Sequence, residues 1–283
     1  MILKSSNEND LPKLLNYGKA KGILRLNKLM PTLTPFKEVI LVDSFEDLLK
    51  IQKTLPENYF YRRDLPLNIE LGKRTPKSGK KENMLEFFKK MKETEPKSAL
   101  LILPSDIKNL PRYVSNGAFN VAINKGENVI LEFVGKGFDA RELTHGTVCH
   151  ETYNIPWYAI LFCNNVIKLN KYKVSSITEK EYQATREERI KYLNKIGATA
   201  EQIDEYLPKN YVAPKNSVKE LILDKIVFPL FLESQTMKDN NLNFSWICGN
   251  ITDKNIVMPY EYSTPERVIK NYTAKNVEQN LSY

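Results

Sequence analysis

Short apolar runs bounded by turn residues predict several β-strands along the chain. Residues 38–44 (EVILVDS) and the continuous apolar run 98–104 (SALLILP) have the length and composition of buried strands. Two longer segments, 117–133 (GAFNVAINKGENVILEF) and 243–261 (NFSWICGNITDKNIVMPYE), read as β-hairpins around polar turns. The first hairpin should turn at 124–127, which would pair its two alternating strands.

Other segments repeat their apolar residues at helical spacing. Residues 45–55 predict an amphipathic helix with Ser44 as its N-cap, and residues 81–94 predict another. The second half of the chain is richer in helices, which we expect at the segments 178–197, 199–208 and 217–236. Thr199 and Gln202 have the spacing of a capping box, and Pro229 should kink the last of these helices.

The order of these elements indicates an α+β protein with two lobes, since strands and helices do not alternate strictly. We expect an N-terminal lobe at 1–98, a C-terminal lobe at 99–272 and a polar tail at 273–283. Near the start, residues 11–31 predict a helix that Gly18 and Gly22 break and that Pro31 closes.

Composition narrows the class of protein. Hydrophobic residues make up 42% of the 283 residues and charged residues 27%, which is typical of a globular chain. The three cysteines lie far apart and argue against a disulfide framework. The N-terminus lacks the apolar core of a signal peptide and the apolar segments are short for a bilayer, so we expect a cytoplasmic protein without a membrane partner.

Positive charge is concentrated in one part of the chain. The formal net charge is +8, and residues 71–98 hold nine Lys or Arg against four Glu. Such a segment attracts phosphate groups, either of free nucleotides or of a nucleic acid. The alternative interpretation is a solvent-exposed loop followed by a helix whose lysines lie on its solvent-exposed face.

Sequence motifs for several common sites are missing. The chain has neither a GxxxxGK[ST] loop nor a GxGxxG fingerprint nor an HExxH pair. A metal site built on His145 and His150 would need carboxylates to complete it. Cys149 and His150 are adjacent, and adjacent residues of a strand point apart, so a Cys–His nucleophile is not favoured.

Ionisable residues crowd the segment after the apolar run 129–134. Glu132 lies inside that run, where it could point outward to solvent, contact a ligand or form a core salt bridge. Gly135 and Gly137 frame Lys136, and Arg141 follows shortly after. Lys136 and Arg141 suit anion binding, with solvated side chains as the alternative, and the two glycines would let the loop backbone approach a ligand.

Five segments, taken in order, resemble the nucleotide-binding, ATP-grasp-type domain of phosphoenolpyruvate synthase and pyruvate phosphate dikinase. They are YGKAKGILRLNKLMP (17–31), YRRDLP (61–66), ALLILPS (99–105), VILEFVGKGFDARELTHGTVCHETYNI (129–155) and FSWICGNITDKNIVMPYEYSTPER (244–267). The resemblance implies a two-lobed ATP-grasp-like fold that holds ATP and Mg²⁺ between its lobes.

The resemblance also implies roles for individual residues. It places Lys19 and Arg62 at positions that contact phosphates, and Glu132 at an acidic strand position near the nucleotide. The strand 99–104 corresponds to the one that offers backbone groups to adenine, which makes Leu101 and Leu103 candidate nucleotide contacts.

Candidate catalytic residues are the cations that could stabilise a transferring phosphoryl group: Arg62, Lys136 and Arg141. The chain departs from the family at Ser245, where the family has a metal-binding glutamate. Glu261 could supply the missing carboxylate, with Asn250 as a weaker candidate ligand of Mg²⁺.

The resulting hypothesis is an ATP-dependent phosphotransferase or ligase that acts on an unidentified small-molecule or acidic substrate. Two alternatives stay open. One is a nucleotide-sensing or regulatory protein that has lost metal-dependent catalysis, as Ser245 hints. The other is a nucleic-acid-binding protein that uses the basic segment 71–97.

Overall fold

A computed structural model shows an α+β protein made of two compact units. One unit comprises Met1–Asn109 and Tyr260–Thr273, and the other Leu110–Pro259 and Ala274–Tyr283. The expected α+β class is confirmed, and the lobe bounds 1–98 and 99–272 stay a prediction. The structure describes residues 2–6, 17–56, 59–65, 83–104, 115–124, 128–144, 146–236 and 244–263. Residues 66–82, which hold much of the basic segment, therefore lie outside the described part.

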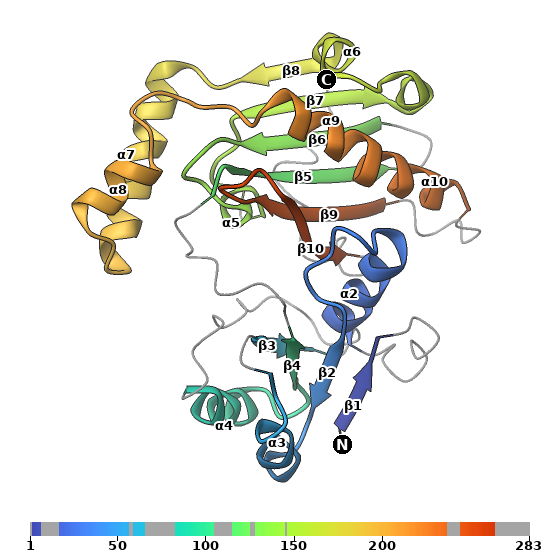
Figure 1. Cartoon of the computed structure of the whole chain (residues 1–283), viewed down its shortest axis with the longest axis vertical. Helices are drawn as coiled ribbons and strands as arrows, with labels where there is room; N and C mark the ends of the chain where they lie inside the picture. Colours follow the sequence, from blue (N-terminus) through green and yellow to red (C-terminus); the bar gives the residue numbers. More distant parts are fainter. Residues whose placement is uncertain are drawn as a thin grey trace. The chain divides into compact units, whose positions relative to one another are not determined.

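The first unit contains a four-stranded antiparallel sheet (Figure 1). Its strands run in the order β1-β2-β4-β3. All four residues of β2 are buried, as its uninterrupted apolar sequence predicts. The strand bounds are β1 Ile2–Ser5, β2 Val39–Val42, β3 Tyr59–Asp64 and β4 Ala99–Pro104.

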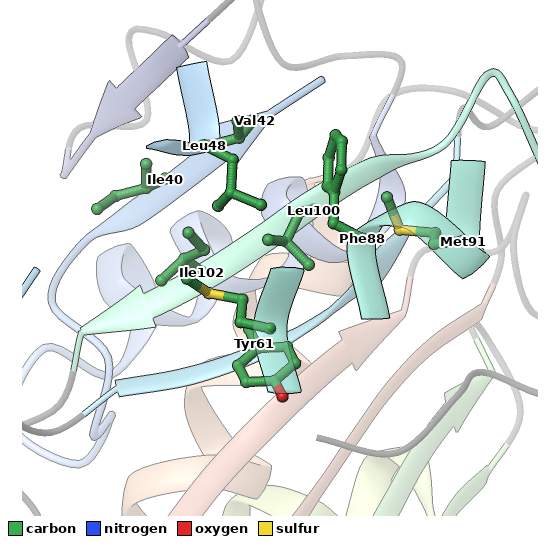
Figure 2. Packing of buried hydrophobic residues seen from close by; sticks show 9 residues of the cluster. Ile40, Val42, Leu48, Tyr61, Phe88, Met91, Leu100 and Ile102 are labelled. Atoms are coloured by element: carbon green, nitrogen blue, oxygen red, sulfur yellow. The ribbon is translucent and has the colours of Figure 1, made fainter. Parts of the chain in front are cut away.

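Helices α3 (Phe45–Gln52) and α4 (Met84–Thr94) pack against this sheet around one apolar cluster. Figure 2 shows Leu48 of α3 and Phe88 of α4 meeting side chains of the strands, among them Ile102. The predicted cap is present, because the Ser44 hydroxyl accepts a hydrogen bond from the Asp47 amide at 3.2 Å.

Helix α2 (Gly18–Leu29) differs from the prediction, because it runs unbroken through both glycines. A Cβ atom at Gly22 would lie 2.3 Å from the Tyr262 carbonyl oxygen. The glycine therefore permits close packing of helix against strand, at the modest cost that glycine brings to a helix interior.

The second sheet is antiparallel and has six strands in the order β10-β9-β5-β6-β7-β8. Its residues belong to the second unit, except for Tyr260–Ser263 of β10, which belong to the first. Both predicted hairpins are confirmed as β5–β6 and β9–β10, and the pairing of Ile123 with Val129 leaves the expected residues at the first turn. The bounds are β5 Gly117–Asn124, β6 Asn128–Val134, β7 Glu151–Pro156, β8 Lys173–Ser176, β9 Phe244–Ile251 and β10 Val257–Ser263.

In Figure 1 α9 and α10 cross one face of this sheet, α7 and α8 lie at one end of it, and α6 lies at the edge beside β8. The predicted helix 217–236 is a continuous rod in which α9 and α10 are joined by a π-helical turn, Leu223–Val227. The irregularity precedes Pro229, whose ring and missing N–H disturb the preceding turn. The helix bounds are α5 Ala140–Thr144, α6 Val166–Leu169, α7 Glu179–Lys195, α8 Ala200–Tyr206, α9 Asn216–Ile222 and α10 Phe228–Thr236.

The α9–α10 rod covers the face of the sheet that carries Phe133 and Tyr153. Lys219 of α9 places its amine 5.5 Å from the Phe133 ring centre and 5.7 Å from that of Tyr153. Since neighbouring strand residues point to opposite faces, Glu132 and Thr152 lie on the face away from α9.

Replacing Leu48 by alanine should lower the free energy of unfolding of the first unit by about 2–5 kcal/mol, because it leaves a cavity in a fully buried cluster. Chemical denaturation measures the change. Leu49→Ala is the matched control, since Leu49 is the next residue of α3 and is 41% exposed. Equal losses in the two variants would contradict this description of the core.

Candidate functional site

Three polar side chains form a row across the middle of the second sheet. In the strand register Asn120 of β5 lies opposite Glu132 of β6, and Glu132 lies opposite Thr152 of β7. We call these three residues the polar row. It occupies the face away from α9, whereas the residues next to it in each strand, such as Phe119 and Phe133, are apolar and fully buried.

Glu132 is the centre of this row and is only 8% exposed. One carboxylate oxygen accepts a hydrogen bond from the Asn120 Nδ2 amide at 2.7 Å. Burial raises the pKa of Glu132, and the bond from Asn120 offsets part of that rise. Of the three alternatives left by the sequence, solvent exposure is therefore wrong, and a salt bridge is not formed with any described residue.

Two more oxygen atoms on this face lack partners. The side-chain oxygens Oδ1 of Asn120 and Asn154 are buried and have no hydrogen-bond partner among the described residues. Asn154 follows Thr152 by two positions, so both lie on one face of β7. A buried acceptor without a donor costs about 1–3 kcal/mol, which marks this face as a place where a ligand with hydrogen-bond donors would be stabilised.

Cys149 lies beside the row but is unsuited to nucleophilic chemistry. Its thiol is 3.3 Å from the Thr152 hydroxyl. Burial and, secondly, the negative charge of Glu132 raise its thiol pKa to about 12. A thiol with this pKa stays protonated at neutral pH, and the thiolate is the reactive form.

His150 has a structural position. Its Nδ1 atom accepts a hydrogen bond from the Gly135 amide at 3.0 Å, and its ring packs edge-on against Phe138, Tyr182 and Tyr211. Burial lowers its pKa to about 4 despite the nearby charge of Glu151. The imidazole is therefore neutral at neutral pH.

Glu151 is neutralised on the other face of the sheet. Its carboxylate forms ion pairs with Lys219 and with Lys173, the latter at 2.7 Å, and accepts a hydrogen bond from the Tyr153 hydroxyl at 3.2 Å. These partners outweigh the effect of burial and lower the pKa of Glu151. The cluster ties α9 and β8 to β7.

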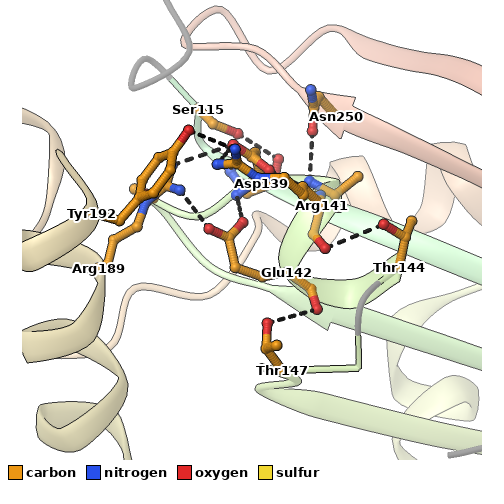
Figure 3. Close-up of polar contacts among 12 residues, drawn as sticks. Ser115, Asp139, Arg141, Glu142, Thr144, Thr147, Arg189, Tyr192 and Asn250 are labelled. Carbon is orange, nitrogen blue, oxygen red and sulfur yellow. Dashed lines mark hydrogen bonds and ion pairs between the residues drawn. The ribbon is translucent and has the colours of Figure 1, made fainter. Parts of the chain in front are cut away.

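The ionisable residues after β6 form a buried ion cluster with α7 (Figure 3). Arg189 pairs with Asp139 at 3.4 Å, forms an ion pair with Glu142, and donates from Nε to the Gly137 carbonyl oxygen at 2.9 Å. Its side chain is 2% exposed. One guanidinium thus holds the loop 137–142 against α7.

The two carboxyl groups of this cluster are shifted in opposite directions. Burial and the neighbouring charge of Asp139 raise the pKa of Glu142 to about 8, although Arg189 opposes the shift. Burial would also raise the pKa of Asp139, but Arg189 and Arg141 outweigh it and lower the value. The negative charge of this pair therefore lies mainly on the Asp139 carboxylate, and Glu142 is the group that holds a proton more readily.

Arg141, a predicted catalytic residue, belongs to the same cluster. It pairs with Asp139 at 3.5 Å, donates to the Tyr192 hydroxyl at 2.5 Å and stacks over the Tyr192 ring at 4.2 Å. Asn250, a predicted metal ligand, is close by and uses its side-chain oxygen to accept the Ala140 amide at 2.9 Å. Both side chains thus fix the start of α5.

The glycine-framed loop is shaped by contacts within the chain. Gly137 has φ +87°, and a Cβ atom there would lie 2.8 Å from the Tyr206 carbonyl oxygen; one at Gly135 would lie 2.3 Å from that of Val212. The expectation that these glycines admit a ligand is therefore corrected. Lys136 donates its amide to Val212 at 3.0 Å, and its half-buried side chain has no hydrogen-bond or ion-pair partner among the described residues.

In the first unit, Lys19 lies at the start of α2 and is 7% exposed. Its amine donates to the Arg63 carbonyl oxygen at 3.1 Å. The amides of Lys19 and Ala20 donate to the Asp64 carboxylate at 3.0 and 2.8 Å. The Asp64 carboxylate thus occupies the helix end where an external phosphate would otherwise be stabilised.

Arg62 and Glu261 are brought together, as an ion pair of 3.3 Å in which both side chains are largely buried. The pairing of a predicted phosphate ligand with a predicted metal ligand was not expected, because the two residues are far apart in sequence. The adjacent Arg63 forms its own ion pair with Glu95.

Leu101 and Leu103, the candidate nucleotide contacts of the hinge strand, lie within the first sheet. Their strand, β4, is an interior strand that pairs with β2 on one side and β3 on the other. Leu101 has partners in both strands, and the side chains of Leu101 and Leu103 are 0% and 2% exposed. They belong to the core of the first unit.

The predicted Mg²⁺ ligands do not fit a metal site. Glu261 is paired with Arg62, and the only side-chain oxygen of Asn250 accepts a backbone amide. Within the described ranges, moreover, no group of three or more His, Cys, Asp or Glu side chains could hold a metal ion. We therefore assign no Mg²⁺ site to these residues.

Comparison with known proteins does not place the chain in a family. No family model matches it, and no curated protein matches its sequence. Among solved structures it is similar to a dinucleotide-forming acetyl-coenzyme A synthetase 1 from Ca. Korarchaeum cryptofilum, solved with coenzyme A, acetyl-coenzyme A and a phosphorylated phosphohistidine segment. The TM-score is 0.43 at 8% identity, covering 92% of this chain and 99% of that one, and at this level the likeness carries no functional argument.

No helix within the described residues is both long and apolar enough to cross a lipid bilayer.

Replacing Arg189 by methionine should lower the free energy of unfolding of the second unit by about 3–5 kcal/mol, because it leaves Asp139 and Glu142 buried without their main partner. Arg186→Met is the control: its Nε donates to one carbonyl oxygen, of Pro208, so a loss of about 1 kcal/mol is expected. Denaturant titration of both variants measures the two losses in the free energy of unfolding. Similar losses would contradict the anchoring role of Arg189.

Replacing Glu132 by glutamine should make the protein less sensitive to alkaline pH. The pKa of Glu132 is raised in the folded state above its value of about 4.5 in the unfolded chain. The side chain therefore contributes its full stabilisation at pH values below 4.5, and this contribution is lost as the pH rises through the pKa of the folded state. The stability difference between Glu132→Gln and the wild type should therefore grow in favour of the variant from pH 5 upward. Denaturation at several pH values measures it, with exposed Glu188→Gln as control. A constant difference would show that Glu132 is not perturbed.

Proposed function

We propose that this chain binds a nucleotide and that the polar row contacts the ribose or the base. The observation that carries the proposal is the buried Asn120–Glu132 pair with two further acceptors, Oδ1 of Asn120 and of Asn154, left without donors. A ribose offers hydroxyl donors and adenine an amino group, so either would supply what these oxygen atoms lack. The resemblance in sequence, which does not depend on this geometry, implies that Glu132 lies near a nucleotide.

The phosphate end of the ligand would be held by Lys136. This residue lies in the turn that follows β6, the strand that carries Glu132. Its half-buried side chain has no ion-pair partner among the described residues, unlike Arg62 and Arg141. Of the three candidate cations, Lys136 could therefore bind a phosphate without first breaking a contact that the structure describes.

Catalysis is the stronger form of the proposal: an ATP-dependent phosphotransferase or ligase in which Lys136 and Arg141 of the second unit stabilise the transferring phosphoryl group. The ion pairs of Arg62 and Arg141 favour the weaker form, a nucleotide-sensing protein that binds without turnover. An assay of ATP consumption distinguishes the two, with and without Mg²⁺.

ATP should raise the melting temperature of the wild-type protein in a saturable manner. At a hundredfold excess over Kd the added stability would be about 2.7 kcal/mol. Glu132→Gln should weaken binding about tenfold or more, because a charged hydrogen bond contributes about 1.5–3 kcal/mol. A thermal-shift titration with ATP, ADP and adenosine measures this.

The controls separate the two ends of the ligand. Glu188→Gln should respond to ATP like the wild type, since Glu188 is exposed on α7. Lys136→Ala should lose the preference for ATP over adenosine but keep the response to adenosine. No shift with any nucleotide at millimolar concentration would end the proposal.

A further inference from the structure

Large apolar side chains stand exposed on two consecutive turns of the second unit. Tyr158, Leu161 and Phe162 belong to the 3₁₀ segment Trp157–Phe162, and their exposed fractions are 63%, 58% and 69%. Ile167 of α6 is 78% exposed and Trp157 47%. We call these five residues the apolar patch. Single exposed apolar residues are ordinary, but such a group marks an interaction surface.

The patch continues onto the neighbouring helix. The segment Trp157–Phe162 contacts α10, on which Phe228 and Leu232 are 37% and 47% exposed. Helix α6 is fixed to α9, because the Val166 amide donates to the Glu220 carboxylate at 3.2 Å. In Figure 1 both turns lie at the same edge of the second sheet, beyond β7.

Charge within the segment that carries the apolar patch has one sign. Between Glu151 and Glu179 the sequence has no Asp or Glu, but it has three lysines. Lys168 and Lys171 are exposed, and Lys173 is partly exposed beside its ion pair with Glu151. Lysines beside apolar and aromatic side chains complement a layered surface that carries negative charge at its outer boundary and has an apolar interior.

Other occupants fit this pattern less well. A second copy related by a two-fold axis would bring two copies of this lysine-bearing segment together, and the segment itself has no acidic residue to pair with them. A single-stranded nucleic acid would use the lysines and aromatic rings, but it would leave Leu161, Ile167 and Leu232 without an apolar partner. An anionic lipid surface matches both the aliphatic and the basic side chains.

We propose that the apolar patch is a peripheral binding site for anionic membrane surfaces. Trp157, Tyr158 and Phe162 would enter the boundary between headgroups and acyl chains, and Lys168 and Lys171 would contact anionic headgroups. The expectation of no membrane partner came from the lack of spanning segments, which does not concern binding from one side.

The test is co-sedimentation of the full-length protein with vesicles of phosphatidylcholine, with and without phosphatidylserine. The protein should pellet with the vesicles that contain phosphatidylserine, and less so as salt rises. Lys168→Glu with Lys171→Glu should weaken binding roughly fivefold per lysine. Phe162→Glu should weaken binding to the vesicles that contain phosphatidylserine about tenfold or more.

Trp157 provides a second readout in the same experiment. The chain has two tryptophans, and Trp246 is buried at 3% exposure. Vesicles should therefore shift the tryptophan emission of the wild type to shorter wavelength, and Trp157→Phe should remove the shift. The matched control is Ile256→Glu, at a 53% exposed apolar residue in the turn between β9 and β10, which should bind like the wild type.

Three outcomes would overturn the proposal. The first is a lack of sedimentation with either vesicle. The second is a concentration-dependent dimer that Phe162→Glu dissociates while vesicles have no effect, which would assign the patch to a second copy. The third is binding to single-stranded oligonucleotides that Lys168→Glu abolishes in the absence of any vesicle binding.

Discussion

The hydrogen bond between Asn120 and Glu132 is the contact on which the functional account depends. It lies across β5 and β6 in the middle of an antiparallel sheet, where a charge is costly and one amide donor compensates for little of that cost. The other face of the same strands carries the apolar contacts with the α9–α10 rod. The sheet thus uses one face for stability and keeps acceptors with unmet hydrogen-bonding capacity on the other.

Much of the fold could be predicted because its signals are local. The hairpin β5–β6 follows from two alternating strands around a polar turn, and Ser44 and Thr199 cap the helices that they precede. The same turn fixes the partner of Glu132: once Ile123 pairs with Val129, Asn120 must lie opposite Glu132. The hairpin register in the sequence therefore identifies Asn120 as the neighbour of Glu132. The hydrophobic pattern of each strand taken alone does not show this.

The rest could not be predicted, because it depends on contacts between distant residues. Nothing near Asp139 and Glu142 indicates that Arg189 of α7 neutralises them, and nothing near Arg62 points to Glu261. Glycines that frame a lysine are typical of ligand-binding loops, yet here they admit the backbone at Tyr206 and Val212. Residues that suit phosphate binding by type are thus largely used within the chain.

The direct test of the account is the titration of the Glu132 carboxyl by carbon-13 NMR, with and without a saturating nucleotide. Donors from a bound ribose or base favour the ionised carboxylate, so the account predicts that the pKa of Glu132, raised by burial in the free protein, falls when the nucleotide binds. A nucleotide that binds and leaves this pKa unchanged would contradict the assignment of the polar row as its site.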